Sequence, residues 1–168
     1  MTQQATDNFF SNDVNGLDAS SKLPYFPANF LGIVKVDAIK AIRPRAGGRA
    51  YCVEFSVESS NIPDVFVGGR YSWYQKIPDV DAQTALGNII GFLLAAVGLD
   101  PTRDAAKIAA EVKPNQQRIL NDSCSSRQPL AGARVQLQTK VIVTKAKKQD
   151  FTLHAFSIAP PLAAAPSA

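Results

Sequence analysis

Five segments of this chain alternate apolar and polar residues, and one stretch of helical spacing lies between the third and the fourth. Successive side chains of a strand point to opposite faces of a sheet, so each alternating segment can bury one face and expose the other. The expected strands cover residues 30–42, 51–58, 67–77, 134–143 and 151–158. Three strands, a helical insertion and two further strands predict a mainly β domain.

The first expected strand changes phase part-way along. Val34, Val36 and Ala38 alternate with polar residues, and the apolar positions then move to Ile39 and Ala41. One extra residue in a strand produces such a shift, so the pattern predicts a β-bulge. The glycine-containing turn 43–49 follows, and the first two strands are therefore expected to form a hairpin.

The insertion after the third strand has helical spacing. Its apolar stripe of Leu86, Ile90, Leu93 and Val97 predicts a helix that faces the core. Asp81 is the expected N-cap, and Gly98 is the expected left-handed residue that ends the helix. A second helix is expected to begin at an Asp100 cap with Pro101 in its first turn and to continue to about Val112.

The two ends of the chain differ in composition from the part between them. Residues 1–22 are rich in Asn, Asp, Ser, Thr and Gln, and residues 159–168 are rich in Pro and Ala. Such segments bury too little apolar surface to order their backbone. We therefore expect a flexible N-terminal arm (1–22) that carries Phe9 and Phe10, one folded domain (23–158) and an extended C-terminal tail (159–168).

Cysteine and histidine are scarce, which argues against several kinds of site. Cys52, Cys124 and His154 are the only residues of these types, too few for a zinc cluster or a disulfide framework. The chain opens without a basic and apolar leader, and its apolar run at residues 87–99 is too short to span a bilayer. We expect a soluble cytoplasmic protein with no enzymatic activity, no cofactor, no metal and no membrane partner.

The order of the expected elements is that of an OB-fold, a five-stranded, partly open Greek-key barrel that binds oligonucleotides or oligosaccharides. Its binding surface lies on the second and third strands, between the loop that joins the first two strands and the loop that joins the last two. Both loops are basic here, in a chain with a formal net charge of +4. Basic loops on both sides of one groove suit a phosphate backbone. The alternative is that they are ordinary solvated turns.

The third expected strand divides its side chains between two faces. Arg70, Tyr74 and Lys76 share one parity, and this order of cation, ring and cation suits unstacked bases. Tyr71 and Trp73 share the other parity and are expected in the core, with Trp73 at the barrel mouth as the rival stacking residue. The full set of expected nucleic-acid-binding residues is Arg43, Arg45, Arg49, Arg70, Trp73, Tyr74, Lys76, Arg134, Lys140, Lys145, Lys147 and Lys148.

Four short motifs add a family resemblance. They are Tyr25-Phe26-Pro27, the run 67–73, the run 86–94 with Gly98-Leu99-Asp100, and the closing hairpin 145–156. In these motifs the chain resembles phage-encoded single-stranded-DNA-binding proteins of the OB type. The resemblance implies protection of single-stranded DNA during phage or plasmid replication or recombination, in the host cytoplasm, with little sequence preference and no cofactor. The chain lacks the acidic C-terminal tip through which many such proteins recruit partners.

The expected partner is single-stranded DNA, and replication or recombination proteins are expected partners of the same system. The sequence leaves open whether RNA binds as well, because an OB groove can accept either polymer. It also leaves the oligomeric state open. The alternative function is a structural or assembly protein of a virion, in which the barrel edge and Phe9 and Phe10 make protein contacts and the basic turns confer solubility.

Overall fold

The computed structural model describes residues 23–43, 48–143 and 150–161. Its sheet is antiparallel, with five strands in the order β3-β2-β1-β4-β5. The strands are β1 (Leu31–Ile42), β2 (Arg49–Val57), β3 (Arg70–Ile77), β4 (Arg134–Val143) and β5 (Asp150–Ile158). The predicted mainly β domain with a helical insertion after the third strand is confirmed. The arm 1–22 and residues 162–168 of the tail lie outside the described residues.

The predicted bulge in β1 is confirmed. The pairing of β1 with β2 shifts register between Val36 and Ala38. Before the shift Val34 and Val36 are buried, and after it Ile39 and Ala41 are buried instead. The bulge therefore keeps an apolar face of β1 on the core along the whole strand, although the sequence alternation changes phase.

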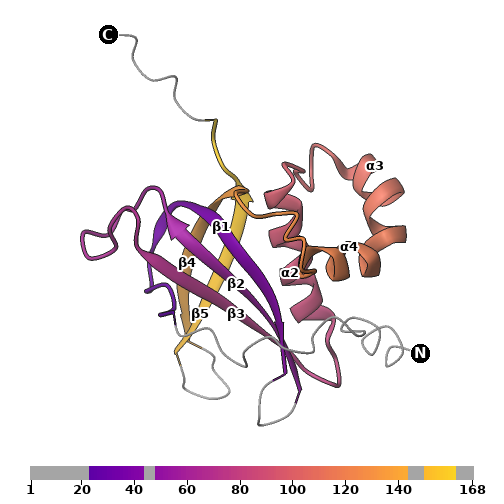
Figure 1. Cartoon of the computed structure of the whole chain (residues 1–168), viewed down its shortest axis with the longest axis horizontal. Helices are drawn as coiled ribbons and strands as arrows, with labels where there is room; N and C mark the ends of the chain where they lie inside the picture. The colour runs from indigo at the N-terminus through magenta and orange to yellow at the C-terminus, as the bar shows by residue number, and fades with distance from the viewer. Residues whose placement is uncertain (1–22, 44–47, 144–149, 162–168) are drawn as a thin grey trace.

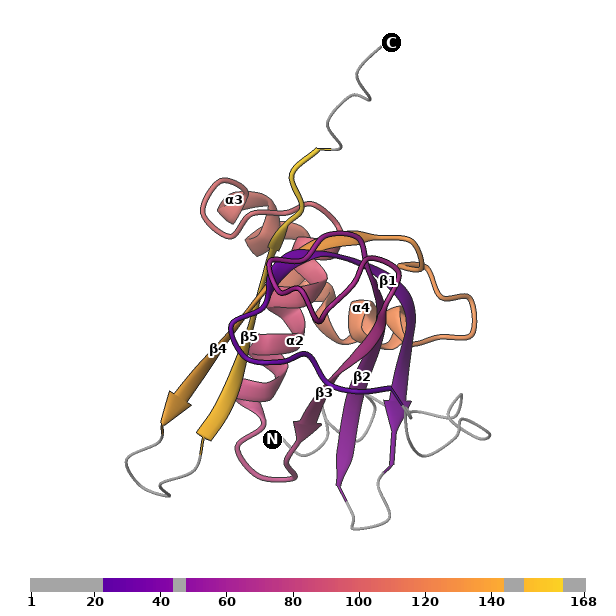
Figure 2. The ribbon, with the colours of Figure 1, turned by 90° about the vertical axis from the view of Figure 1, so that its left-hand side faces the viewer.

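The sheet curls around an aromatic core (Figures 1 and 2). Tyr51 and Phe55 of β2 are fully buried on its inner face, and Trp73 of β3 is only 3% exposed. The ring of Trp73 lies 4.7 Å from that of Phe156 on β5 and 5.7 Å from that of Phe92. These contacts join β3 and β5, the two edge strands of the sheet, across the inside of the curl.

Helix α2 (Gln83–Ala96) packs across the gap between the two edge strands (Figure 2). The expected stripe of this helix is only part of its inner face, since Leu93 is buried in the core as expected but other buried positions lie beside the stripe. Ala85, Ile89 and Phe92 are buried, whereas Val97 at the end of the expected stripe is 54% exposed. The helix is apolar on most of its circumference, so its periodicity gives no unique inner face.

The ends of α2 agree only partly with the sequence. Asp81 is not the N-cap, because its backbone is left-handed (φ 63°) and the cap is Ala82, which makes no side-chain hydrogen bond to the helix. Gly98 does adopt the expected left-handed conformation (φ 78°). The Leu99 N–H then donates to the Leu94 carbonyl at 2.8 Å, which closes the helix end.

The second helical region begins later than expected, because residues 101–104 form a turn and the first helix starts at Ala105 with Asp104, not Asp100, as its cap. Asp100 Oδ1 accepts the N–H groups of Thr102 and Arg103, both at 2.8 Å, and these hydrogen bonds lower the pKa of the Asp100 carboxyl. The predicted single helix is replaced by short pieces. They are α3 (Ala105–Lys107), a π-helical turn (Ile108–Val112), a 3-10 turn (Lys113–Asn115) and α4 (Gln116–Ser123). Helix α4 was not expected, because its sequence is polar except at Ile119 and Leu120.

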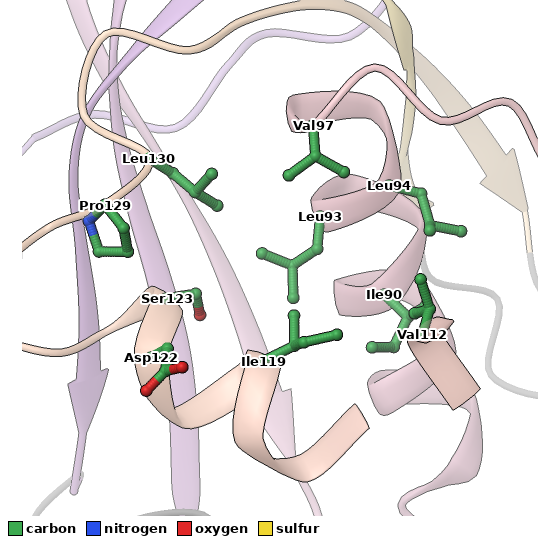
Figure 3. A pocket seen from close by; sticks show the side chains of 10 residues that line it. All are labelled: Ile90, Leu93, Leu94, Val97, Val112, Ile119, Asp122, Ser123, Pro129 and Leu130. Carbon is green, nitrogen blue, oxygen red and sulfur yellow. The ribbon is translucent and has the colours of Figure 1, made fainter. Parts of the chain in front are cut away.

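An apolar cavity of about 220 Å³ lies between α2 and α4 (Figure 3). The stripe of α2 that was expected to face the core lines one wall of it. The lining residues are Ile90, Leu93, Leu94, Val97, Val112, Ile119, Asp122, Ser123, Pro129 and Leu130. The helical region 105–123 is thus a second layer packed on the outer side of α2, and the nucleic-acid-binding residues expected from sequence lie elsewhere.

Candidate nucleic-acid interface

The outer face of β1, β2 and β3 carries the polar side chains of these strands. In the β2–β3 register Ser56 pairs with Arg70, Cys52 with Tyr74, and Ala50 with Lys76. The inner face of both strands is taken by the core residues Val53, Phe55 and Trp73 and their neighbours. Arg70, Tyr74 and Lys76 therefore lie along one outward-facing row, as the alternation predicted.

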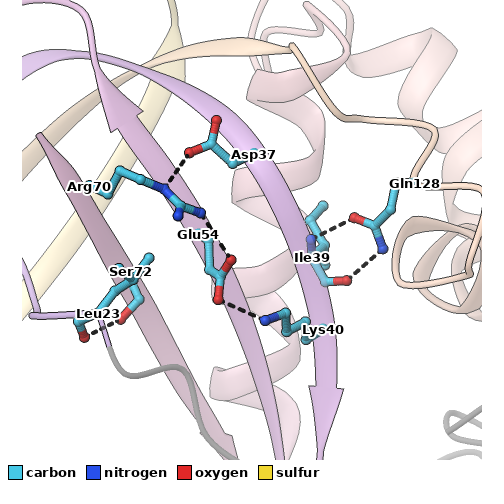
Figure 4. A network of polar contacts seen from close by, with 8 residues as sticks. All are labelled: Leu23, Asp37, Ile39, Lys40, Glu54, Arg70, Ser72 and Gln128. Atoms are coloured by element: carbon cyan, nitrogen blue, oxygen red, sulfur yellow. Dashed lines mark hydrogen bonds and ion pairs between the residues drawn. The ribbon is translucent and has the colours of Figure 1, made fainter. Parts of the chain in front are cut away.

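Arg70 is engaged in an ion-pair network on this face (Figure 4). Its guanidinium lies 3.4 Å from Asp37 and 3.5 Å from Glu54, and Lys40 Nζ approaches the other oxygen of Glu54 at 2.8 Å. Ser56 Oγ also donates to Asp37 at 2.6 Å. Two cations and two carboxylates balance each other here. The network thus fixes the middle of the face and leaves little net positive charge at Arg70.

Tyr74 is half-buried and packs on a small apolar cluster outside the main core. The cluster consists of Ile42, Ala50 and Cys52. Burial raises the pKa of the Tyr74 hydroxyl, and the nearby Tyr25 and Cys52 raise it further. The ring is thus supported from below by β1 and β2 while part of it remains accessible, which is the arrangement that a stacking surface needs.

Three cations lie where β1, β2 and β3 end together, and of these Lys76 shares the outward row of Tyr74. Lys76 and Arg43 are exposed, and neither forms an ion pair within the described part of the chain. Arg49 is half-buried and pairs with Ile77 of β3. Figures 1 and 2 show that the adjoining ends of β1 and β2 and those of β4 and β5 reach the same end of the molecule. Arg45, Lys145, Lys147 and Lys148 lie outside the described residues.

The remaining expected site residues have different environments. Arg134 is half-buried and its guanidinium pairs with Glu58, so its charge is balanced. Lys140 is exposed on the distal part of β4. Trp73 lies in the core, so its ring offers no surface on which a base could stack, and we leave it out of the interface. The parity of the strand had favoured this core position over the barrel mouth.

His154, the single histidine of the chain, lies on β5 with its ring 6.3 Å from Trp73. Burial lowers its pKa, and a hydrogen bond with the Thr152 backbone opposes that shift. The buried Nε2 atom has no hydrogen-bond partner within the described structure. We infer that the folded protein holds His154 neutral, so that protonation favours the unfolded chain.

Stability is therefore expected to fall as the pH drops below about 6.5, the usual histidine pKa, and to keep falling until the lower pKa of the folded state is passed. Urea unfolding between about pH 7.5 and about pH 5 measures this, because most carboxyl groups titrate lower. His154→Gln should flatten the dependence. An equal slope in the variant would assign the effect to other groups.

No cluster of three or more His, Cys, Asp or Glu side chains suited to a metal ion occurs among the described residues. The helices in that part of the structure are also too short or too polar to cross a membrane. No protein-family model and no curated protein sequence matches the chain.

Proposed function

We propose that this protein binds single-stranded DNA, without sequence specificity and without chemistry on it, on the outer face of β1, β2 and β3. The observation that carries the proposal is the accessible, supported ring of Tyr74 beside Lys76, the next cation on the same outward row, which no carboxylate of the described structure neutralises. A ring for base stacking and cations for the phosphate backbone are the two components of non-specific single-strand binding.

The topology supports an OB-type assignment. Strands β1, β2 and β3 are consecutive neighbours, and β4 returns after the helical insertion to lie on the other side of β1. This spatial order is a Greek key. The contact between Trp73 on β3 and Phe156 on β5 brings the two edge strands toward the closure that a barrel requires. We propose on this basis, and on the family resemblance, a role in protecting single strands during phage or plasmid replication or recombination.

The balanced network around Arg70 changes which cations are expected to contact phosphate. Asp37 and Glu54 already neutralise Arg70, and Glu58 neutralises Arg134. A phosphate drawn to either guanidinium would meet a carboxylate as well. We therefore place the strand over the Tyr74 and Lys76 end of the face, at the end of the molecule that the adjoining ends of β4 and β5 also reach (Figure 2).

The direct test is binding of a fluorescently labelled oligo(dT) at several salt concentrations. We expect a dissociation constant in the micromolar range or below. The constant should rise with salt concentration, because binding releases counterions from the DNA and this release is less favourable at high salt. An oligo(U) arm of the same length measures the preference between DNA and RNA. Absence of binding at low salt would overturn the proposal and favour a structural or assembly role.

Tyr74→Ala is expected to weaken oligo(dT) binding by about 1 to 3 kcal/mol, and this loss should persist at high salt because base stacking is not screened. Tyr74→Phe keeps the ring and is the matched control, with nearly unchanged affinity expected. The measurement is fluorescence anisotropy at low and at high salt, after thermal unfolding has shown that the variants are folded.

Lys76→Ala provides the electrostatic contrast on the same strand. Its loss of affinity should shrink as the salt concentration rises. The slope of log affinity against log salt concentration should become shallower by about one, which corresponds to the loss of one phosphate contact. If Tyr74→Ala and Lys76→Ala respond to salt in the same way, the division between stacking and phosphate contact at this site is wrong.

A further inference from the structure

The chain segment that precedes β1 crosses the free edge of β3. The Ser72 N–H donates to the Pro24 carbonyl at 2.8 Å, and Ser72 Oγ donates to the Leu23 carbonyl at 3.1 Å (Figure 4). Tyr25 pairs with Ser72 in an isolated parallel bridge. The segment thus acts as a short extra strand beside β3, at the level of the candidate interface.

The next residues anchor this segment in the core. Phe26 is 4% exposed, and its ring lies 4.9 Å from Tyr71 and 5.0 Å from Phe30. Farther on, Thr139 Oγ1 donates to the Pro27 carbonyl at 2.6 Å and accepts the Phe30 N–H at 2.9 Å. Hydrogen bonds on one side and aromatic packing on the other therefore hold the backbone at Tyr25.

The anchoring determines where the side chain of Tyr25 points. Adjacent residues of an extended chain point to opposite sides, and Phe26 points into the core. Partners in a parallel bridge point to the same side, and Ser72 belongs to the outward row that also holds Arg70 and Tyr74. Tyr25 is accordingly directed to the outer face, where its side chain is 64% exposed.

We propose that Tyr25 is a second stacking surface of the single-strand site, so that one base of the bound strand lies on Tyr74 and a neighbouring base lies on Tyr25. The inference rests on the proposed function. Two features support it. Both rings belong to one face and sit on rigidly held backbone, which lowers the entropy cost of ordering them on binding. The exposed ring of Tyr25 also contributes little to folding, so it is available to stack on a base. Their proximity is also reflected in the contribution of Tyr25 to the raised pKa of Tyr74.

No pattern in the sequence indicates this role for Tyr25. Tyr25 lies outside every alternating segment, and β3 is 45 or more residues away along the chain. Only the hydrogen bonds to Ser72 bring it to the interface.

The test compares Tyr25→Ala with Tyr25→Phe in oligo(dT) binding at high salt. We expect Tyr25→Ala to weaken binding about tenfold and Tyr25→Phe to leave it nearly unchanged, because the ring and not the hydroxyl supplies the contact. Thermal unfolding should be little altered in either variant. If both variants lose affinity equally, the hydroxyl makes the contact and the stacking assignment is overturned.

An abasic oligomer of the same length separates stacking from other effects. It keeps the phosphates and lacks the bases, so Tyr25→Ala should bind it as tightly as the wild-type protein does. An equal loss on oligo(dT) and on the abasic oligomer would overturn the inference. Wild-type protein that binds no oligo(dT) would overturn the proposed function itself, whereas wild-type binding that Tyr25→Ala leaves unchanged would overturn only the role of Tyr25.

Discussion

Phe92→Ala is expected to lower the free energy of unfolding by about 3 to 5 kcal/mol, the usual cost of removing a buried aromatic ring. Phe92 is completely buried on α2. Its ring contacts residues of three strands, at 5.8 Å from Phe55 on β2, 5.7 Å from Trp73 on β3 and 5.1 Å from Phe156 on β5. One side chain thus joins both edge strands to the centre of the sheet.

The cavity left by this substitution cannot easily close, because the surrounding rings are held by three different strands. Val97→Ala is the matched control on the same helical region, since Val97 is 54% exposed and should cost well under 1 kcal/mol. Urea unfolding of the three proteins measures the difference. A loss below about 1.5 kcal/mol for Phe92→Ala would show that α2 is not the element that holds β3 and β5 together.

A methyl group at Gly32 should be nearly as harmful. A Cβ atom built there lies 2.0 Å from the Ser59 carbonyl oxygen and 2.7 Å from the Phe30 ring. Ser59 cannot move away freely, because the Glu58 N–H donates to the Ile33 carbonyl at 2.8 Å and Ser59 Oγ accepts the Ile33 N–H at 2.9 Å. We expect Gly32→Ala to destabilise the fold by about 3 kcal/mol or more, the upper end of overpacking costs.

Gly91→Ala is the matched control for this prediction. Gly91 lies in α2, and a Cβ there meets nothing within 4 Å. Alanine is the better helix former, so this variant should gain about 0.5 to 1 kcal/mol. Chemical unfolding of both variants tests the pair. Equal stabilities of the two variants would mean that the segment after β2 moves to make room for the methyl group, and that its hydrogen bonds to β1 do not hold it in place.

Some features of the candidate site follow from the sequence of a single strand, and others depend on contacts between strands. That Arg70, Tyr74 and Lys76 share a face follows from the period of two, and the register confirms it. That Arg70 is neutralised does not follow, because its partners Asp37 and Glu54 come from two other strands. The sequence pattern could assign a face to each cation but not the carboxylates opposite it.

The amino-acid sequence by itself determined the strands and the bulge in β1, because side-chain alternation is a property of neighbouring residues in one segment. Tertiary structure alone decided which face of α2 meets the sheet. Both faces of that helix are apolar, and its orientation is set by the packing of Phe92 against Trp73 of β3 and Phe156 of β5. It also decided the place of Tyr25, which is set by hydrogen bonds to a strand distant in sequence. Contacts of this kind depend on how separate elements meet in space, and no periodicity within a single element encodes them.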